Sequence, residues 1–445
     1  MKLIGNGILI TRNSKSPLIF NGCVAIDGNV IADYGTTEEL KKKYQDAEFT
    51  DAEGMVIMPG LINTHHHIYS AFARGMMLSD SKASNNFTEI LENLWWRVDK
   101  VLSLEDVKYS AYATFMDSIK NGVTTLFDHH ASQGAVETSL FTLADVAKDL
   151  GLRASLCYEV SDRDGQEVCD ASIKENIDFI KHTQADTTDM IKGMLGIHAS
   201  FTVSTETLAK CVKEMGDLNA GYHIHTAEGM ADLQDSLDKY GKRVVERLYD
   251  AGIMTDKSIL VHCIHTNEFE HRLLKEKNCM VVHNPESNMG NAVGRTPIFK
   301  LLDKGITLGL GTDGYTSDMS ESLKVAKVLH SHDLVNSNIG WGEAPGMLFD
   351  GNKEIADRFF NKSLGIIEKG AYADVIVVDY DSLTPMNENN INSHMLFGLQ
   401  GRSVVSTMIN GKFVMKNRVI MNVNEKEIMK KSREVSARFW ERMEG

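Results

Sequence analysis

Short apolar runs alternate with longer, more polar segments through the middle of the chain. The runs are rich in Val, Ile and Leu, and eight stand out, at residues 55–67, 123–129, 153–158, 194–198, 221–225, 259–262, 280–283 and 306–313. Apolar strands separated by helical segments are typical of βα units that share a parallel sheet. Eight such units between residues 55 and 363 predict an α/β fold with a (β/α)8 TIM-type barrel. A doubly wound open sheet is the alternative, although the sequence of these units has no glycine-rich dinucleotide turn.

The two ends of the chain carry a different pattern, in which short β-rich runs are joined by tight turns. The turn 27–29 (Asp-Gly-Asn) separates two apolar runs near the start, and the turn 410–412 (Asn-Gly-Lys) separates two near the end. Such turns between apolar runs are hairpin signals. We therefore expect residues 1–57 and 364–445 to form one small β-sandwich domain, with the barrel domain at 58–363. The charged final segment predicts an amphipathic helix with apolar positions at Ile428, Val435, Phe439 and Trp440.

Composition narrows the class of protein. With 445 residues, 42% hydrophobic and 24% charged, the chain can bury a large core and exceeds the usual size of one domain. It begins without a signal peptide and has no apolar run long enough to span a membrane, so we expect a soluble, cytoplasmic protein with no membrane partner. The net charge of −14 comes without a basic stripe, which argues against nucleic acid as a partner. The cysteines lack CxxC spacing and are expected to be reduced and mostly buried: Cys23, Cys157, Cys169, Cys211, Cys263 and Cys279.

Seven of the eight predicted strands end in or at a histidine or an aspartate. Core packing does not explain this regularity, because imidazoles and carboxylates are costly to bury without a partner. Active sites of (β/α)8 barrels lie at the carboxyl ends of the strands. The strand ends therefore predict one active site lined by these side chains.

The segment 59–67 (Pro-Gly-Leu-Ile-Asn-Thr-His-His-His) places two imidazoles on one face of a strand. Side chains alternate across a strand, so His65 and His67 point the same way while His66 points away. His225 at the end of the fifth strand adds a third imidazole, and Asp313 after the eighth adds a carboxylate. This set suits a single divalent metal with an open position for water. Surface histidines are the alternative at 65–67, and a helix N-cap is the alternative for Asp313.

Further polar residues near the same strand ends have candidate roles around that metal. Glu228, three residues after His225, can take or relay a proton, or is a solvated residue in the first turn of a helix. His262 ends the sixth strand and can hold the water or polarise the attacked centre, with His265 as the competing candidate. His223, one strand repeat deeper than His225, is expected to support a ligand or to be a hydrogen-bonded core residue.

The fourth and seventh strands end in His198 and His283, which we assign to the substrate rather than to the metal. Two-metal barrels of this kind often bridge their metals with a modified lysine at the end of the fourth strand. Lys192 lies at the opposite end of that strand, so a single metal is favoured.

A polar loop rich in Ser, Gly and Asn covers residues 69–88 and is expected to act as a lid over the metal. A helix with an apolar stripe follows it. Trp95 falls on that stripe and is expected in the core. Trp96 falls outside it and is a candidate to stack on a flat heterocycle, the alternative being an exposed or helix-packed position.

Taken in order, these motifs resemble the amidohydrolase superfamily, in its single-metal deaminase and chlorohydrolase branch. The motifs are residues 59–67, 225–228, 262–263, 283–288 and 311–314, and the resemblance extends to 364–370 and 373–374. Residues 63–76 and 91–98 are most similar to a group of aminohydrolases within that branch. The resemblance implies one bound divalent metal, zinc before iron, with the ligands His65, His67, His225 and Asp313.

The resemblance also implies roles in a reaction. Asp313 would take the proton of the metal-bound water, Glu228 would relay a proton to a ring nitrogen, and His262 would orient the attacking hydroxide. The implied reaction is hydrolytic deamination of a nitrogen heterocycle with release of ammonia. Candidate substrate contacts are His198, His283, Asn288, Trp96, Tyr69 and Arg74.

The sequence defines the substrate and the class of protein less closely than it defines the metal ligands. The triple histidine and residues 127–130 also resemble the 8-oxoguanine deaminase group, which indicates a purine-like ring by analogy. Hydrolysis of a cyclic amide or of a carbon–chlorine bond is the alternative reaction. A non-catalytic barrel kept as a scaffold is the alternative class, although no ligand of the motif is missing here. A homodimer is common among the proteins that the chain resembles.

Overall fold

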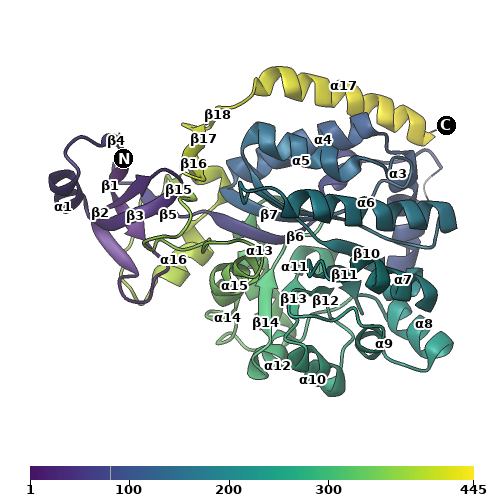
Figure 1. Ribbon diagram of the computed structural model, residues 1–445. Coiled ribbons are helices and arrows are strands. Elements are labelled where there is room, and N and C mark those ends of the chain that lie inside the picture. The colour runs from purple at the N-terminus through teal and green to yellow at the C-terminus, as the bar shows by residue number, and fades with distance from the viewer. Residues whose placement is uncertain (81, 445) are drawn as a thin grey trace.

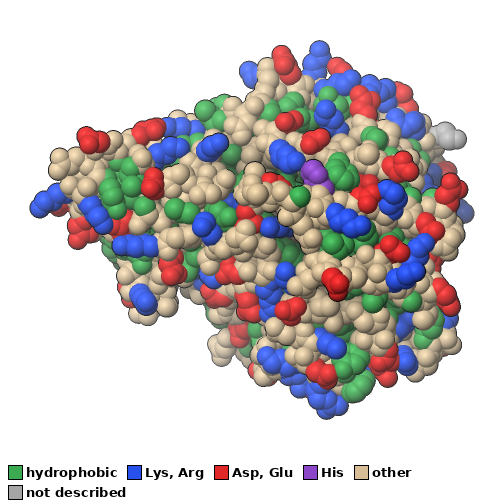
Figure 2. Space-filling view, in the orientation of Figure 1, with side chains coloured by type: hydrophobic (Ala, Val, Ile, Leu, Met, Phe, Trp, Pro, Cys, Tyr) green, Lys and Arg blue, Asp and Glu red, His purple; other side chains and the backbone are tan. Residues whose placement is uncertain are grey.

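The computed structural model describes residues 1–80 and 82–444, which form a mixed α/β structure (Figure 1). Residue 81, in the segment predicted as a lid, and residue 445 lie outside the described residues. All six cysteines are free and buried, as predicted. None of the helices formed by the described residues has the length and apolar character needed to span a membrane. Acidic and basic side chains are intermingled over the face of the molecule in Figure 2.

The middle of the chain forms two sheets of parallel strands. One has the order β6-β7-β8-β9 and the other the order β10-β11-β12-β13-β14, and all neighbouring pairs are parallel. Isolated parallel bridges join the two sheets, from Val160 to Ile197 and from His66 to Asp313. The strands are β6 (Leu61–His66), β7 (Val123–His130), β8 (Arg153–Tyr158), β9 (Ile191–Gly193), β10 (Leu195–Ala199), β11 (Tyr222–Thr226), β12 (Ile259–His262), β13 (Met280–His283) and β14 (Thr307–Leu310). Each of the eight predicted runs contains one of these strands, and only β9 was not predicted.

Helices connect these strands and pack outside the two sheets (Figure 1). The longer ones have ordinary start signals: α4, for example, begins after Ser103, whose side chain accepts from the amide of Asp106 while Asp106 bonds back to Ser103. The helices of this region are α2 (Phe87–Ile90), α3 (Trp96–Val101), α4 (Leu104–Lys120), α5 (Ser139–Leu150), α6 (Gln166–Gln184), α7 (Thr205–Met215), α8 (Met230–Tyr240), α9 (Val244–Asp250), α10 (Glu268–Glu276), α11 (Pro285–Gly290), α12 (Ile298–Asp303), α13 (Met319–Asp333), α14 (Glu343–Pro345) and α15 (Asn352–Asp357). Short 3₁₀ turns lie at η1 (Ile68–Ala73), η3 (Ser200–Thr202) and η5 (Gly401–Ser403), and π-helical turns at η2 (Leu91–Trp95) and η4 (Gly346–Gly351).

A third sheet is built from both ends of the chain. Its nine strands have the order β18-β17-β16-β15-β5-β1-β2-β3, with β4 paired to β1. Both predicted hairpins are present, β2 with β3 and β16 with β17. In the second, Asn410 and Gly411 have φ of 52° and 73°, the left-handed values that a two-residue hairpin turn requires. The elements are β1 (Lys2–Ile10), β2 (Leu18–Asp27), β3 (Val30–Thr36), β4 (Glu48–Asp51), β5 (Val56–Pro59), β15 (Val375–Val378), β16 (Val404–Ile409), β17 (Lys412–Lys416) and β18 (Val419–Ile420), with helices α1 (Thr37–Lys43) and α16 (Ile391–Gly398).

The run 55–67, expected as one strand, is two strands in two different sheets. β5 pairs with β1 and β15, and β6 pairs with β7. The chain crosses between the sheets at Gly60, where a Cβ would lie 2.2 Å from the side chain of Thr124. A glycine is therefore required at the crossing. Because the apolar run continues on both sides of Gly60, the sequence pattern does not reveal the change of sheet.

The predicted amphipathic helix is α17 (Glu425–Glu444), which lies along α4 and α3 (Figure 1). Its buried positions include Val435, Phe439 and Met443, and the Phe439 ring lies 6.1 Å from that of Phe72. The indole of Trp440 donates to the carbonyl oxygen of Phe72 over 2.7 Å. The helix is thus anchored to η1, the turn that follows the histidine segment.

Replacement of Phe439 by alanine should lower the free energy of unfolding by about 3–5 kcal/mol, because a fully buried ring is lost and a cavity remains. The change is measured as a fall in the urea midpoint and in Tm. Glu434 on the same helix is exposed, so Glu434→Ala is the control and should stay within about 0.5 kcal/mol of the parent. Equal stability of the two variants would contradict the proposed docking of α17.

Candidate active site

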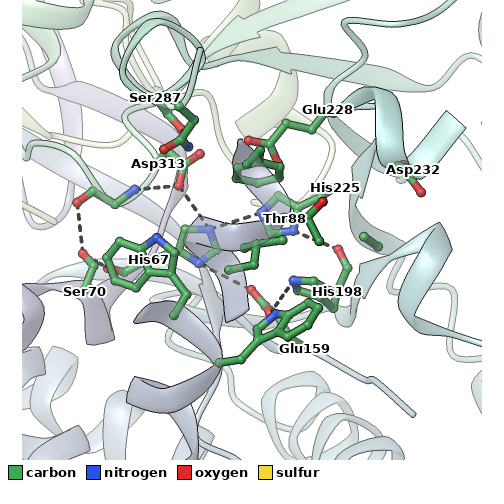
Figure 3. Close-up of a pocket in the computed structure, with 18 of the residues that line it drawn as sticks. His67, Ser70, Thr88, Glu159, His198, His225, Glu228, Asp232, Ser287 and Asp313 are labelled. Carbon is green, nitrogen blue, oxygen red and sulfur yellow. Dashed lines mark hydrogen bonds and ion pairs between the residues drawn. The ribbon is translucent and has the colours of Figure 1, made fainter. Parts of the chain in front are cut away.

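The four predicted metal ligands lie together at the carboxyl ends of β6, β11 and β14. Figure 3 shows three of them, His67, His225 and Asp313. His67 Nε2 is 3.2 Å from His225 Nε2 and 3.3 Å from Asp313 Oδ1. The ring centroid of His65 lies 4.8 Å from that of His67 and 5.1 Å from that of His225. Donor atoms from three distant segments therefore surround one point.

Hydrogen bonds to backbone carbonyls define the tautomers of two of these rings. His67 Nδ1 donates to the carbonyl oxygen of His129 over 2.6 Å, and His225 Nδ1 donates to that of His198 over 2.8 Å. A carbonyl oxygen only accepts, so each Nδ1 carries a proton and Nε2 is the nitrogen of each ring left to bind a cation. The two Nε2 atoms face each other across 3.2 Å. Ligand nitrogens about 3.3 Å apart are expected around a tetrahedral ion with bonds of about 2.0–2.1 Å, so the donor set fits a bound cation.

His65 is oriented by a third histidine. Its Nδ1 lies 2.9 Å from His223 Nε2, while its buried Nε2 has no hydrogen-bond partner. His223 thus occupies the supporting position that was one of its two expected roles. Partners of this kind hold the ring orientation of metal-ligating histidines.

Two carboxylates and His262 form the second half of the site. His262 Nε2 is 3.4 Å from both Glu228 Oε2 and Asp313 Oδ2, and its Nδ1 lies 2.8 Å from Asn288 Oδ1. Burial raises the pKa of Glu228 well above its usual range, and the nearby charge of Asp313 raises it further. Burial alone would raise the pKa of Asp313 too, but the imidazoles of His67, His262 and His225 outweigh it and hold that pKa at about 2. The pKa values of the two neighbouring carboxyl groups are therefore shifted apart, the separation that acid–base pairs require.

The backbone is strained where these side chains leave their strands. Ala227, His262, Cys263 and Asp313 have φ of 48°, 69°, 50° and 54°. Left-handed conformations of non-glycine residues cost on the order of 1–3 kcal/mol each and cluster at functional sites. As a result of these conformations, the chain turns out of β11, β12 and β14 with its polar groups directed into one cavity.

The predicted substrate contacts divide into two groups. Tyr69, Trp96 and His198 line the cavity that contains the site. Arg74 is exposed and lines a separate groove beside α17. His283 is fully buried against His330 and Thr296, and Asn288 lies behind His262, so neither is among the residues that line the cavity.

The segment expected as a lid and the helix after it form one wall of the cavity. Phe87, Thr88 and Leu91 line it, together with both tryptophans. Trp95 also packs partly on the apolar cluster around Phe72, which explains its position on the apolar stripe of the sequence. Trp96 carries the guanidinium of Arg163 on its ring at 4.7 Å.

Sequence reasoning missed Glu159 and gave no role to His129. Both are buried, and Glu159 Oε1 lies 3.4 Å from His129 Nδ1 and 3.5 Å from His67 Nδ1. Glu159 follows the last residue of β8 directly, so this strand also ends at an ionisable residue. It was overlooked because the candidate residues of this strand were sought only as far as Tyr158, where β8 ends as predicted. A search one residue beyond each strand end would have found it.

Known protein sequences and solved structures match this chain over nearly its whole length. The sequence model of the Amidohydrolase family matches residues 56–414. A 5'-deoxyadenosine deaminase of Methanosarcina acetivorans is 31% identical, with 97% of this chain and 96% of that protein covered. Among solved structures, an adenosine deaminase from Xanthomonas campestris with bound zinc superposes with a TM-score of 0.87 at 22% identity, covering 98% of both chains. An atrazine chlorohydrolase from Arthrobacter aurescens complexed with zinc gives 0.83 at 21% identity, covering 98% of this chain and 100% of that one.

His223→Gln should weaken zinc binding by about 10–100-fold, because the partner that orients His65 is altered. Competition with a chelator measures the dissociation constant without use of a substrate. His332 is exposed on α13, so His332→Gln is the matched control and should bind zinc like the parent. Unchanged affinity in His223→Gln would show that His223 is only a packing residue.

Proposed function

The chain belongs to the amidohydrolase family, and from that premise we propose that it is a metal-dependent deaminase of a purine-like heterocycle that releases ammonia. As a member of this family it is a hydrolase acting on carbon–nitrogen bonds other than peptide bonds. The observation that carries the proposal is the contrast between Asp313, whose pKa is lowered, and Glu228, whose pKa is raised, with both carboxyl groups 3.4 Å from His262 Nε2. Deamination needs both a proton acceptor for water and a proton donor for the ring.

The finer architecture is part of the proposal. The two parallel sheets would close into one (β/α)8 barrel within residues 58–363, and residues 1–57 and 364–445 would form a small β-sandwich domain. The bridges Val160–Ile197 and His66–Asp313 support closure, because they join the two sheets at both free edges in parallel register. The superposition with the Xanthomonas campestris structure supports the same fold.

His65, His67, His225 and Asp313 would hold one divalent metal, with zinc the first choice and iron the second. Three imidazoles and a carboxylate are a donor set suited to either ion. The Nε2 atoms of His67 and His225, which face each other across 3.2 Å, support this assignment because two nitrogen ligands of one ion have about this spacing. When bound, such an ion supplies a water nucleophile that ionises near neutral pH.

Side chains of this protein then accept and donate the protons of the reaction. Asp313 accepts a proton from the attacking water through its carboxylate. Glu228 donates its proton to a nitrogen of the ring, which makes the neighbouring amino-bearing carbon open to attack. His262, held at Nδ1 by Asn288, orients the water between the two carboxylates. A proton returned to the amino group lets ammonia leave.

The walls of the cavity favour a flat, partly apolar substrate. Tyr69, Phe87, Trp95 and Trp96 line it, and the polar groups gather at the metal end. The relative from Methanosarcina acetivorans is a deaminase of an adenosine derivative, which supports a purine-like ring here.

The test is ammonia release from aminopurine bases and their nucleosides by the zinc-loaded protein. For any substrate found, Glu228→Gln should lower kcat by about 10²–10⁴-fold, because the proton donor to the ring is lost. Its metal content should stay at the parent value. Glu214 is exposed on α7, and Glu214→Gln is the control with unchanged kcat.

Ammonia from none of these rings would contradict deamination. Chloride release or ring opening by the same protein would identify the alternative hydrolysis instead. Full activity of Glu228→Gln would remove its proposed role while leaving the reaction in place.

A further inference from the structure

The two parallel sheets meet at two seams, and the ladder of backbone hydrogen bonds is interrupted at both. One seam lies between β8 and β10 and the other between β6 and β14, because the strands of each pair belong to different sheets. Along the described residues, each seam contains a single isolated bridge, Val160–Ile197 in the first and His66–Asp313 in the second. Buried backbone groups beside such an interruption need other hydrogen-bond partners.

At the seam between β6 and β14, the side chain of Asn352 provides these partners. Its Oδ1 accepts from the amide of Leu310 over 2.7 Å and from the hydroxyl of Thr64 over 3.1 Å. Its Nδ2 donates to the carbonyl oxygen of Ile62 over 2.7 Å and to that of Leu310 over 2.8 Å. The residue is fully buried, and these four bonds use both donors and both acceptor positions of its amide.

A second asparagine has the corresponding place at the seam between β8 and β10. Asn176, on α6, accepts at Oδ1 from the amide of Tyr158 over 2.8 Å and from that of Gly196 over 3.3 Å. Its Nδ2 donates to the carbonyl oxygen of Tyr158 over 2.8 Å and to that of Ser172 over 3.1 Å. Each seam is therefore bridged by a fully buried asparagine that belongs to a helix outside the sheets.

The segment before Asn352 is shaped to bring this side chain close to the strands. Helix α15, which Asn352 begins, packs against both β6 and β14. A Cβ at Gly351 would lie 2.0 Å from the carbonyl oxygen of Leu308, and a Cβ at Gly309 would lie 2.6 Å from Asn352 Oδ1, so both positions require glycine. The π-helical turn η4 ends directly before Asn352, and turns of this kind are frequent at functional sites.

The proposed metal ligands follow the Asn352 bonds by one to three residues along the chain. Past those bonds, the carbonyl oxygen of His65 accepts from the amide of Thr312 over 3.0 Å and from that of Asp313 over 3.1 Å. The distance between His65 and Asp313 therefore depends on how closely β6 and β14 are held together. None of the four proposed ligands lies on β8 or β10, so the seam of Asn176 does not set a distance between ligands.

We propose that Asn352 is a positioning residue of the active site. It holds β6 and β14 together, so that His65 and His67 on one strand meet Asp313 beyond the other. Asn176 bridges β8 and β10 in the same way and stabilises the fold without arranging metal ligands. This inference rests on the metal site of the proposed function, and it adds to that site a buried side chain that is not among the residues lining the cavity.

The test makes the same substitution at the two seams. In Asn352→Asp and in Asn176→Asp, a carboxylate oxygen replaces Nδ2, so that two carbonyl oxygens lose a donor and Tm should fall in both variants. Titration of the zinc-loaded protein with a chelator gives the Kd for zinc. This Kd should rise about tenfold or more in Asn352→Asp, the usual size of effects on metal ligands from residues outside the ligand set, and stay at the parent value in Asn176→Asp.

A milder change keeps the test decisive if Asn352→Asp does not fold. Thr64→Val removes only the hydroxyl that bonds to Asn352 Oδ1 and to the carbonyl oxygen of Leu310, each over 3.1 Å. Circular dichroism shows whether each variant is folded. The Kd of Thr64→Val for zinc should rise by a smaller factor than that of Asn352→Asp. A parent Kd in folded Thr64→Val, together with an unfolded Asn352→Asp, would overturn the inference.

The outcomes separate a positioning role from a structural one. A lower Tm with an unchanged Kd in Asn352→Asp would show that Asn352 only stabilises the fold. An equal rise of Kd in Asn352→Asp and Asn176→Asp would show that any loosening of the sheets weakens the site. Either result overturns the inference and leaves the metal site in place. A parent that binds no zinc would overturn the metal site of the proposed function, and with it the role of Asn352, before any variant is compared.

Discussion

The arrangement of the whole site depends on the two backbone hydrogen bonds that fix the rings of His67 and His225. Each ring donates from Nδ1 to a backbone carbonyl, so the two Nε2 atoms face each other across 3.2 Å. This spacing matches that of two nitrogen ligands around a tetrahedral ion. The strand ends therefore hold a preformed pair of ligand nitrogens, because the carbonyls that accept from the two rings keep them in place.

The parallel strands provide that rigidity. The carbonyls that accept from His67 and His225 belong to His129 at the end of β7 and His198 in β10, so each ring is held by the neighbouring region of the sheet. The strained residues lie one step further along, where the chain leaves β11, β12 and β14. Strain of this kind persists because the hydrogen bonds and packing around it over-determine the backbone.

The surroundings of each carboxyl group, rather than its residue type, determine the direction in which its pKa is shifted. Glu228 and Asp313 are both buried carboxylates within 3.4 Å of one imidazole nitrogen, yet their pKa values move in opposite directions. Asp313 lies among three imidazoles, whereas the main neighbour of Glu228 is the negative charge of Asp313 itself. Burial raises the pKa of a third carboxyl group, Glu159, well above its usual range, and the side chains of His67, His129 and His198 lie beside it.

Much of this protein was readable from local patterns. Apolar periodicity located the parallel strands and both hairpins, and strand alternation placed His65 and His67 on one side with His66 on the other. The histidines and aspartate at strand ends indicated the ligand set, because the carboxyl ends of parallel strands meet at one edge. The sequence failed where a pattern continued through a change of sheet, as at Gly60, and where a functional side chain lay just beyond a correctly placed strand end, as at Glu159.

Only the tertiary structure shows which nitrogen of each ring is free. The partner of His67 is a carbonyl 62 residues away and that of His65 is an imidazole 158 residues away. The placement of His283 and Asn288 behind His262, rather than on the cavity wall, is of the same kind. A sequence specifies the side chains at the strand ends through local periodicity. Their tautomers, pKa values and access to substrate depend on hydrogen-bond partners that folding brings from distant strands.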